Sequence, residues 1–325
     1  MRIGFVGTGS FAERHAASLR KLGAEVVACA STNAEKARQF ATAHGATVFA
    51  EPLAMIQRRH LDALYIAVPP FAHDGVVELA AARERIPFFV EKPVGLNLDV
   101  CGSVARAVEV AGLVTCVGYL LRESALLPDI RAVLKRNRLT SVRSCRMNGF
   151  PQVHWWRRMA TSGGMMVEQA THMVDLMRHV FGEIRSVSAV TSSGISAGRW
   201  EGCDVYDSME ALMTFDGGLI GSIGISNVLE AGFSKIEIFE AFGRDFHLVF
   251  TFDGVRYREG VANWVETQAP SLDLCLDAEN RRFLDAVQRG DPQGVTCTYA
   301  DGLRTLAVTL AMNDSARTGA TVRLE

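Results

Sequence analysis

The stretch from Arg2 to Ala12 constrains the fold of this chain more than any other. Residues 2–6 form a short apolar run that predicts a strand, and a helical pattern begins near Ser10 and continues to Leu22. Between them lies a turn that contains Gly7 and Gly9. A glycine-rich turn between a strand and a helix is typical of the first βαβ unit of a parallel sheet. We therefore predict such a unit over residues 2–30.

The turn has the residue types that a bound dinucleotide requires. Its first glycine permits a tight turn, its second lets the backbone approach a pyrophosphate, and a small residue after it lets the helix pack on the strand. The amides at the start of the helix face the anion. We predict dinucleotide binding here, against the alternative of a plain tight turn, by Gly7, Thr8, Gly9, Ser10, Phe11 and Ala12.

The end of the second predicted strand, Glu25 to Ala30, bears on which dinucleotide binds. An NAD site usually offers an acidic residue to the ribose diol at this point. Here the chain has Ser31 and Thr32, and the next helix carries Lys36 and Arg38. Hydroxyls and cations suit a 2′-phosphate. The sequence favours NADP with NAD as the alternative, and the two cations could also be ordinary helix-surface charges.

Strands and helices alternate as far as residue 118, and strands follow strands afterwards. The pattern predicts an α/β chain with a Rossmann-type, doubly wound parallel sheet in a dinucleotide-binding domain (1–120). A C-terminal α+β domain (121–325), for substrate binding and oligomerisation, should hold an open, largely antiparallel sheet. Strands are expected near 48–50, 61–68, 88–90, 114–118, 139–149, 184–193, 203–215, 218–227, 234–241 and 245–257, and helices near 72–83, 98–111, 124–135, 278–289 and 300–317.

An apolar strand ends abruptly in the ionisable pair Glu91 and Lys92, followed by Pro93. Ligands of parallel α/β sheets bind beyond the carboxyl ends of the strands, so Lys92 should point at a bound molecule. The chain has five lysines among 34 basic residues, and a lysine can lose its proton when partly buried whereas an arginine cannot. The alternative is a solvated charge pair that closes a strand.

Two prolines end the strand predicted at 61–68. Pro69 and Pro70, after Val68, hold the chain extended at the carboxyl end of that strand, beside the expected nicotinamide. His73 follows at the start of the next predicted helix. It is a candidate for contact with bound ligand, and the alternative is a capping or surface histidine.

A second group of polar residues lies in a helix that Gly163 and Gly164 open. Glu168 and His172 are four residues apart, and Asp175 follows three residues after His172, so all three should project from one face and act on one molecule. His179 continues that face. A metal site is one alternative, although no second histidine or cysteine has recognisable ligand spacing. A polar stripe on a helix surface is the other.

Just before this helix lies an aromatic and basic cluster, Trp155, Trp156 and Arg157, flanked by His154 and Arg158. Aromatic faces can cover the apolar face of a sugar ring while arginines donate to its hydroxyls. The cluster therefore suits a polyhydroxylated ligand, and an anchor at a protein interface is the competing interpretation.

Composition narrows the classes of partner. The 325 residues are 48% hydrophobic and 22% charged, with a net charge of −2 and no Lys/Arg run longer than two. This excludes a nucleic-acid stripe and a membrane-surface patch, so we expect a small-molecule partner. The N-terminus has an apolar strand pattern in place of a charged leader, and no stretch approaches 18 continuous apolar residues, so we expect a cytoplasmic protein. Seven widely spaced cysteines, without a Cys-x-x-Cys pair, predict free and mostly buried thiols.

Together, the glycine turn, Glu91-Lys92-Pro93, and Gly163-Gly164 with His172 and Asp175 resemble the glucose-fructose oxidoreductase / inositol dehydrogenase (Gfo/Idh/MocA) family. The resemblance implies that NAD or NADP binds in the first domain and that the second domain carries the substrate site and mediates homo-oligomer contacts, as a dimer or tetramer. The family's lysine and histidine match Lys92 and His172. Two positions depart from the family pattern, since Glu168 replaces a common Asp and Ala170 a common Gly.

We therefore expect an oxidoreductase that transfers a hydride between a nicotinamide cofactor and a secondary alcohol or ketone of a sugar, cyclitol or sugar derivative. The predicted catalytic residues are Lys92, His172 and Glu168. The predicted cofactor site adds Ser31, Thr32, Lys36, Arg38, Val68, Pro69, Pro70, His73, Glu91 and Lys92 to the turn, and the predicted substrate site comprises Lys92, Tyr119, Trp155, Trp156, Arg157, His172 and Asp175. The alternatives are a retained cofactor in elimination or hydrolysis without net redox change, and an inactive nucleotide-sensing module.

Overall fold

The computed structural model divides the chain into two compact units and describes residues 1–58, 60–150, 152–230 and 232–324. Unit 1 comprises Met1–Glu123 and Asp273–Arg304, and unit 2 comprises Ser124–Leu272 and Thr305–Glu325. The sequence analysis assigned everything after residue 120 to the second domain. The structure instead packs most of α11 (Leu272–Arg289) and the first residues of α12 (Tyr299–Thr318) in unit 1.

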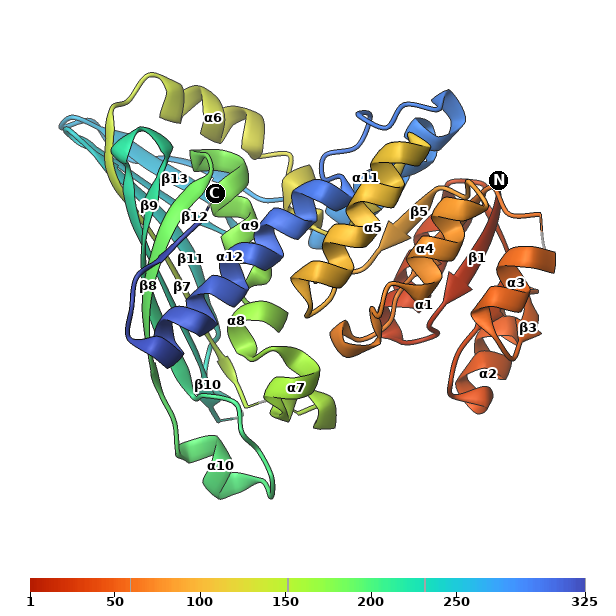
Figure 1. Cartoon of the computed structure of the whole chain (residues 1–325). Helices are drawn as coiled ribbons and strands as arrows, with labels where there is room; N and C mark the ends of the chain where they lie inside the picture. Colours follow the sequence, from red (N-terminus) through yellow and green to blue (C-terminus); the bar gives the residue numbers. More distant parts are fainter. Residues whose placement is uncertain (59, 151, 231, 325) are drawn as a thin grey trace. The chain divides into compact units, whose positions relative to one another are not determined.

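Unit 1 is built on a six-stranded sheet in which every strand pair is parallel (Figure 1). The predicted doubly wound parallel sheet is confirmed, with the strand order β3-β2-β1-β4-β5-β6. The strands are β1 (Arg2–Val6), β2 (Glu25–Ala30), β3 (Thr47–Phe49), β4 (Ala63–Ile66), β5 (Phe88–Val90) and β6 (Thr115–Val117).

Aromatic rings cross one face of this sheet from strand to strand. Phe5, Tyr65 and Phe89 occupy paired positions on β1, β4 and β5, so their rings stack at centroid distances of 5.2 and 4.9 Å. Phe283 of α11 meets Tyr65 and Phe89 edge-on. All four side chains are buried, and they anchor α11 to the sheet by removing large apolar surfaces from water.

Capping residues mark the start of three helices in unit 1. Asn33 and Asn97 cap α2 and α5 by accepting backbone amides of the first turn. The helix predicted at 72–83 starts later, at Val76, because Gly75 at its N-cap adopts a left-handed φ of 82°. The helices are α1 (Ser10–Lys21), α2 (Ala34–His44), α3 (Pro52–Arg58), α4 (Val76–Arg83) and α5 (Leu98–Ala111), with short 3₁₀ turns η1 (Pro70–Ala72) and η2 (Leu120–Glu123).

Unit 2 is built on a nine-stranded sheet that is antiparallel except for the pair β7 and β10. The predicted open, largely antiparallel sheet is confirmed, with the order β14-β13-β12-β11-β7-β10-β9-β8-β15. The strands are β7 (Leu139–Gly149), β8 (Ile184–Ser192), β9 (Ser208–Phe215), β10 (Ile220–Leu229), β11 (Ile236–Gly243), β12 (Phe246–Thr251), β13 (Gly254–Glu259), β14 (Val265–Gln268) and β15 (Val322–Arg323).

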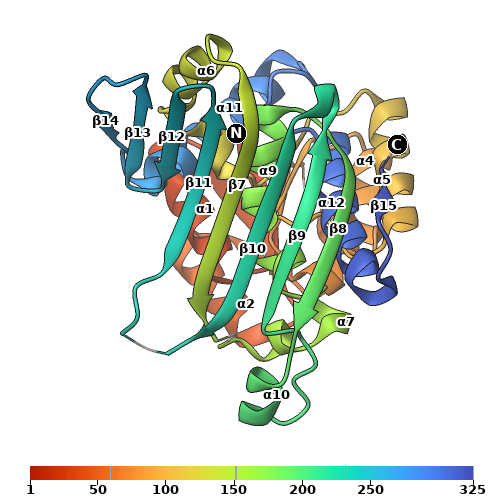
Figure 2. The same ribbon diagram turned by 90° about the vertical axis from the view of Figure 1, so that its left-hand side faces the viewer.

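Helices cover one face of the unit 2 sheet, and side chains on the other face are exposed. Figure 2 shows the strands from one side, with α9 (Thr171–Phe181) and α12 behind them. Along β9 the alternation follows the strand period of two: Met209, Ala211 and Met213 are buried whereas Leu212 is 65% exposed. The remaining helices of the unit are α6 (Leu127–Lys135), α7 (Met159–Ser162), α8 (Met165–Glu168) and α10 (Ile195–Arg199), with η3 (His154–Arg157) and η4 (Asp216–Gly218).

Two predictions of strand bounds in unit 2 were wrong, and one strand was missed. The strand expected at 203–215 begins at Ser208, because the chain before it first forms α10 and a loop. The segment 245–257 is a hairpin of β12 and β13 that turns at Phe252 and Asp253. The sequence analysis did not predict β14, whose four residues are all exposed and therefore carry no alternating apolar pattern.

The prediction of free and mostly buried thiols is confirmed. All seven cysteines are free, and six of them are buried. Burial raises the pKa of Cys29 and of Cys275 to about 11, which keeps these thiols protonated and unreactive at neutral pH. In the part of the chain that the structure describes, no helix is long and apolar enough to cross a membrane.

Candidate active site

The glycine turn leaves polar groups at the start of α1 available to a ligand. Gly9 occupies the N-cap position, and no side chain caps the helix. Thr8 is buried, yet its Oγ1 has no hydrogen-bond partner among the described residues. Buried polar atoms are normally paired, so an orphan hydroxyl beside an uncapped helix start fits a bound anion. These groups match the pyrophosphate of a dinucleotide.

Gly7 and Gly9 serve this turn in different ways. Gly7 has a φ of 91°, and a Cβ added there would lie 2.2 Å from the carbonyl oxygen of Ala67. Gly9 has a φ of −83° and nothing within 4 Å of an added Cβ. The first glycine is therefore required by the protein itself, and the second leaves open space above the turn.

We expect Gly7→Ala to lower the free energy of unfolding by about 2–5 kcal/mol, because it combines left-handed strain with a backbone clash. Gly9→Ala should leave stability within about 0.5 kcal/mol of wild type and weaken dinucleotide binding by about tenfold or more, since a methyl group would occupy the space of the pyrophosphate. Urea unfolding and a fluorescence titration measure the two effects. Equal stability of the two variants would contradict this division of roles.

The cations after β2 are exposed. Arg38 pairs with Glu35 at 2.6 Å, and Asn33 caps α2 by accepting the amide of Lys36. Thr32 is exposed and Ser31 half-buried. Glu35 of the same helix thus already pairs with Arg38, whereas the Lys36 side chain has no acidic partner among the residues that the structure describes.

His73 departs from its predicted surroundings. It lies at the end of η1, three residues before α4, and its side chain is 1% exposed. Its Nδ1 lies 2.8 Å from Oε1 of Glu78, which is also buried. The interpretation as a surface histidine is therefore wrong, and Gly75 takes the N-cap position of α4 whereas His73 is the C-cap residue of η1. Val68 and Pro69 upstream are half-buried and Pro70 is buried.

The pair Glu91 and Lys92 is no solvated charge pair. Glu91 is 7% exposed, and its Oε1 lies 2.7 Å from Nε2 of His15. The Lys92 amide donates to Oε2 of Glu91 at 3.3 Å, and the Lys92–Pro93 peptide is cis. Lys92 itself is half-buried at the carboxyl end of β5. Tyr119, which follows β6, is buried with 1% exposure.

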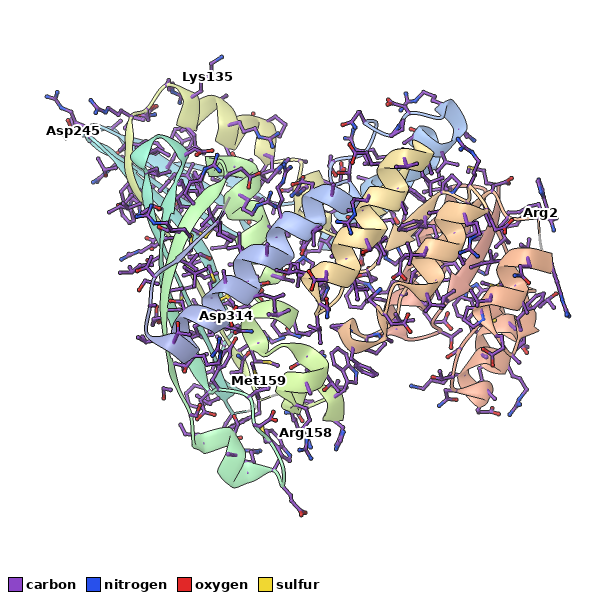
Figure 3. All side chains as sticks on the ribbon, in the orientation of Figure 1. Arg2, Lys135, Arg158, Met159, Asp245 and Asp314 are labelled. Carbon is purple, nitrogen blue, oxygen red and sulfur yellow. The ribbon has the colours of Figure 1, made fainter. Side chains whose placement is uncertain are left out.

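The segment around Gly163 and Gly164 differs from the single helix that the sequence predicted. Gly163 ends α7 in a left-handed conformation, and α8 and α9 follow as two short helices separated at Gln169 and Ala170. Glu168 therefore lies on α8, whereas His172 and Asp175 lie on α9, so the prediction of one continuous helical face was wrong. Figure 3 shows the start of this segment, where Arg158 and Met159 lead into α7.

Two residues distant in sequence fix the glycine pair. The Tyr206 hydroxyl accepts the Met166 amide at 2.9 Å and donates to Asn313. The Asn313 amide donates to the Gly163 carbonyl at 2.7 Å. A Cβ at Gly164 would meet the Tyr206 ring at 2.8 Å, so glycine is required where this ring packs on the backbone. The sequence analysis missed both residues.

Glu168 belongs to a chain of polar groups within unit 2. The Gln169 amide donates to Glu168, and the Arg146 guanidinium on β7 donates to Oε1 of Gln169 at 2.9 Å. Arg146 also pairs with Glu237 of β11 at 3.0 Å. Burial lowers the pKa of Arg146, and the charges of Glu237 and Glu168 oppose that shift. Glu168 is thus a buried group near a half-buried cation.

Asp175 and His172 lie in different surroundings. Asp175 is 1% exposed and accepts the Thr305 hydroxyl at 2.8 Å, while Arg178 donates to the same hydroxyl. His172 is half-buried. Of the two, His172 is the side chain that remains accessible within unit 2, and Asp175 holds a hydroxyl of the protein itself.

The aromatic cluster is arranged on η3 and supported from the loop after α10. The rings of Trp155 and Trp156 lie 5.8 Å apart at nearly a right angle, and both are half-buried. The Arg157 guanidinium stacks over Trp200 at 4.2 Å. Nε1 of Trp156 is buried without a hydrogen-bond partner among the described residues. The structure brings Arg157 together with an aromatic residue that the sequence analysis did not select.

The sequence analysis also missed His15 and Asn280. His15 lies on the buried side of α1 with Ala12, Ala16 and Leu19. A histidine on a mainly apolar helix face is a local signal that could have indicated a buried polar partner. For metal ions, the described residues contain no group of three or more His, Cys, Asp or Glu in a suitable arrangement.

A sheet with this strand order, an uncapped helix after its first strand and an orphan hydroxyl beside it define a dinucleotide-binding protein. The model of an oxidoreductase family with an NAD-binding Rossmann fold matches residues 1–119, and that of the GFO/IDH/MocA C-terminal domain matches residues 130–244. The chain therefore belongs to the Gfo/Idh/MocA family of oxidoreductases, which confirms the resemblance.

Relatives match over nearly the whole chain. Myo-inositol 2-dehydrogenase of Thermotoga maritima is 23% identical over 100% of this chain and 99% of its own length. The 1,5-anhydro-D-fructose reductase of Ensifer adhaerens is 25% identical over 100% and 98%. A levoglucosan dehydrogenase in complex with NADH and L-sorbose superposes with a TM-score of 0.90 at 20% identity, covering 100% of this chain and 99% of that one.

Proposed function

We propose that this oxidoreductase transfers a hydride between NAD(P) and a secondary alcohol or ketone of a sugar, cyclitol or sugar derivative. The observation that carries the proposal is the carboxyl end of β5, where buried Glu91 accepts the Lys92 amide and so fixes a half-buried lysine. A lysine at the end of a parallel strand suits a reacting oxygen. The names of the relatives, a cyclitol dehydrogenase and an anhydrosugar reductase, support the same class of substrate.

The proposed roles divide the chemistry among the side chains. When bound, the nicotinamide supplies hydride chemistry. Lys92 donates a hydrogen bond to the reacting oxygen and stabilises its developing negative charge. His172 exchanges the hydroxyl proton as a general acid or base. Glu168 orients or polarises that histidine, and Asp175 contributes to holding a neighbouring hydroxyl.

An assay panel tests this proposal. Polyols, cyclitols and ketoses are incubated with NAD(H) or NADP(H), and both cofactor absorbance and products are followed. Net cofactor change with at least one substrate is the expected result. Product formation without net change would replace it by elimination or hydrolysis with a retained cofactor, and tight cofactor binding without turnover across the panel would replace it by a sensing module.

For the cofactor we propose NADP(H) in preference to NAD(H), because Ser31 and Thr32 occupy the position where an acid would repel a 2′-phosphate. Protein fluorescence should show tighter binding of NADP(H). Lys36→Ala should weaken NADP(H) binding and leave NAD(H) binding nearly unchanged, whereas Arg38→Ala should have a smaller effect, because Glu35 already pairs with Arg38. Tenfold tighter binding of NAD, a difference of about 1.4 kcal/mol, would overturn this choice.

The proposal includes a homo-oligomer, a dimer or tetramer. It would form through the face of the unit 2 sheet that lies opposite α9 and α12. Val190, Leu212 and Ile220 on adjoining strands are 69%, 65% and 55% exposed. A depression of about 470 Å³ on this sheet includes Leu212, Ile220 and Phe242 in its lining. Contiguous apolar surface of this kind favours burial against another protein surface.

A further inference from the structure

The Glu91 carboxylate is enclosed within unit 1 by a histidine from the helix that follows the glycine turn. Nε2 of His15 lies 2.7 Å from Oε1 of Glu91, and the two side chains are 0% and 9% exposed. A carboxylate this far from water requires a hydrogen-bond donor, because an unpaired buried charge is strongly unfavourable. His15 is that donor.

The other side of the His15 ring is also held. Nδ1 lies 2.9 Å from Oδ1 of Asn280 on α11, and the Tyr65 hydroxyl donates to the same oxygen at 2.9 Å. The ring packs between Phe89 and Tyr65, with centroids at 4.7 and 5.3 Å. Both ring nitrogens therefore lie at hydrogen-bond distance from side-chain oxygen atoms, so the ring is held from two sides in its place against Glu91.

The carboxylate has little room to move away from this donor. A Cβ added at Gly118, just after β6, would lie 3.0–3.2 Å from the carboxyl atoms of Glu91, so the carboxylate rests directly on that glycine. Its second oxygen accepts the backbone amide of Lys92 at 3.3 Å. His15 of α1 and Gly118 after β6 thus both contact the group that holds the Lys92 amide, and α11 holds the His15 ring through Asn280.

We propose that His15 is a positioning residue, which sets the place of the Lys92 backbone through Glu91. The inference rests on the proposed role of Lys92 and extends it: the helix that carries the dinucleotide turn also fixes the lysine. His15 touches neither substrate nor cofactor in this scheme. A displacement of about 1 Å at a reacting group can cost about 10²-fold in rate, which sets the size of the expected effect.

Two variants of His15 each keep one of its two contacts, with Glu91 or with Asn280. The amide nitrogen of a glutamine can reach the position of Nε2, so His15→Gln keeps a donor for Glu91. An asparagine reaches only the position of Nδ1, so His15→Asn keeps a partner for Asn280 and loses the donor. We expect His15→Asn to lower kcat by about 10- to 100-fold with cofactor Kd within about threefold of wild type, and His15→Gln to recover most of that loss. Equal losses in both variants would overturn the proposal.

A double mutant tests whether His15 acts through Lys92. If it does, adding His15→Asn to Lys92→Met should lower turnover by less than about threefold more, because groups that act as one unit are non-additive. A further loss equal to that of His15→Asn in the wild-type background would show a separate, merely structural role.

Crystal structures of the wild type and both variants give a readout that needs no substrate. Glu91 and the Lys92 backbone should keep their places in His15→Gln and move in His15→Asn. Unchanged positions in His15→Asn would refute the positioning role even if no substrate were known. Conversely, a wild type without turnover whose variants show the expected displacements would refute the proposed function and leave the inference standing.

Discussion

The Lys92→Met protein is expected to lose turnover by about 10²- to 10⁴-fold, the usual range for a positioned group that acts on the reacting oxygen. Methionine keeps a long apolar stem and removes the ammonium group, so the half-buried position stays filled. The cofactor Kd should change by less than about threefold, because the dinucleotide phosphates are assigned to the start of α1. Steady-state kinetics with the identified substrate and a fluorescence titration measure the two quantities.

Lys135→Met is a matched control for this substitution. Lys135 is exposed at the end of α6, and the same change of side chain there should leave turnover and cofactor binding within about twofold of wild type. A Lys92→Met protein that turns over its substrate at close to the wild-type rate would reduce the carboxyl end of β5 to a strand terminus without a catalytic role.

The elements that the sequence predicts well are those whose signals are local. Residues 98–111 and 139–149 match α5 and β7, because Asn97 caps the helix and the strand carries its own residue pattern. The break between α8 and α9 could not be predicted, because no proline or glycine marks it at Gln169 and Ala170. Buried contacts of the flanking segments, such as Tyr206 with the Met166 amide, fix that geometry.

In the candidate site, too, residues with a local sequence signal can be predicted and residues fixed by distant contacts cannot. Lys92, Glu91 and the glycine turn can be selected from sequence because each follows a strand in a recognisable pattern. Their partners cannot, since His15 lies 76 residues from Glu91 and 265 from Asn280. Parallel strand order brings them together, and that order is a property of the whole sheet. The aromatic cluster behaves likewise, because Trp200 reaches Arg157 only through the loop after α10.

The burial of Asp175 indicates a structural role in addition to the predicted contact with substrate. Its carboxylate accepts the Thr305 hydroxyl, and Arg178, which binds that hydroxyl, also forms a two-point ion pair with Glu183. Such a network stabilises α9 against α12. Asp175 therefore orients the helix that carries His172, in addition to any hydroxyl that it is proposed to hold.

His172→Ala should lower turnover by about 10²- to 10⁴-fold, as expected for the loss of a general acid or base, with little change in cofactor affinity. His179→Ala is its matched control, because His179 lies on the same helix, is also half-buried and contacts Arg131. That control should keep turnover within about threefold of wild type. Similar losses in both variants would indicate damage to α9.

The proton-transfer role proposed for His172 leads to two further expectations. One limb of the wild-type pH–rate profile should flatten in His172→Ala, because the proposed general acid or base is gone. Glu168→Gln should keep the limb with a smaller loss of turnover, because glutamine keeps a hydrogen-bonding group for the interaction proposed with the histidine. The double variant of Lys92→Met and His172→Ala should lose much less than the product of the single losses, because both side chains are assigned to one substrate oxygen. A fully multiplicative loss would mean that the two residues act independently, and the shared-oxygen mechanism would then be abandoned.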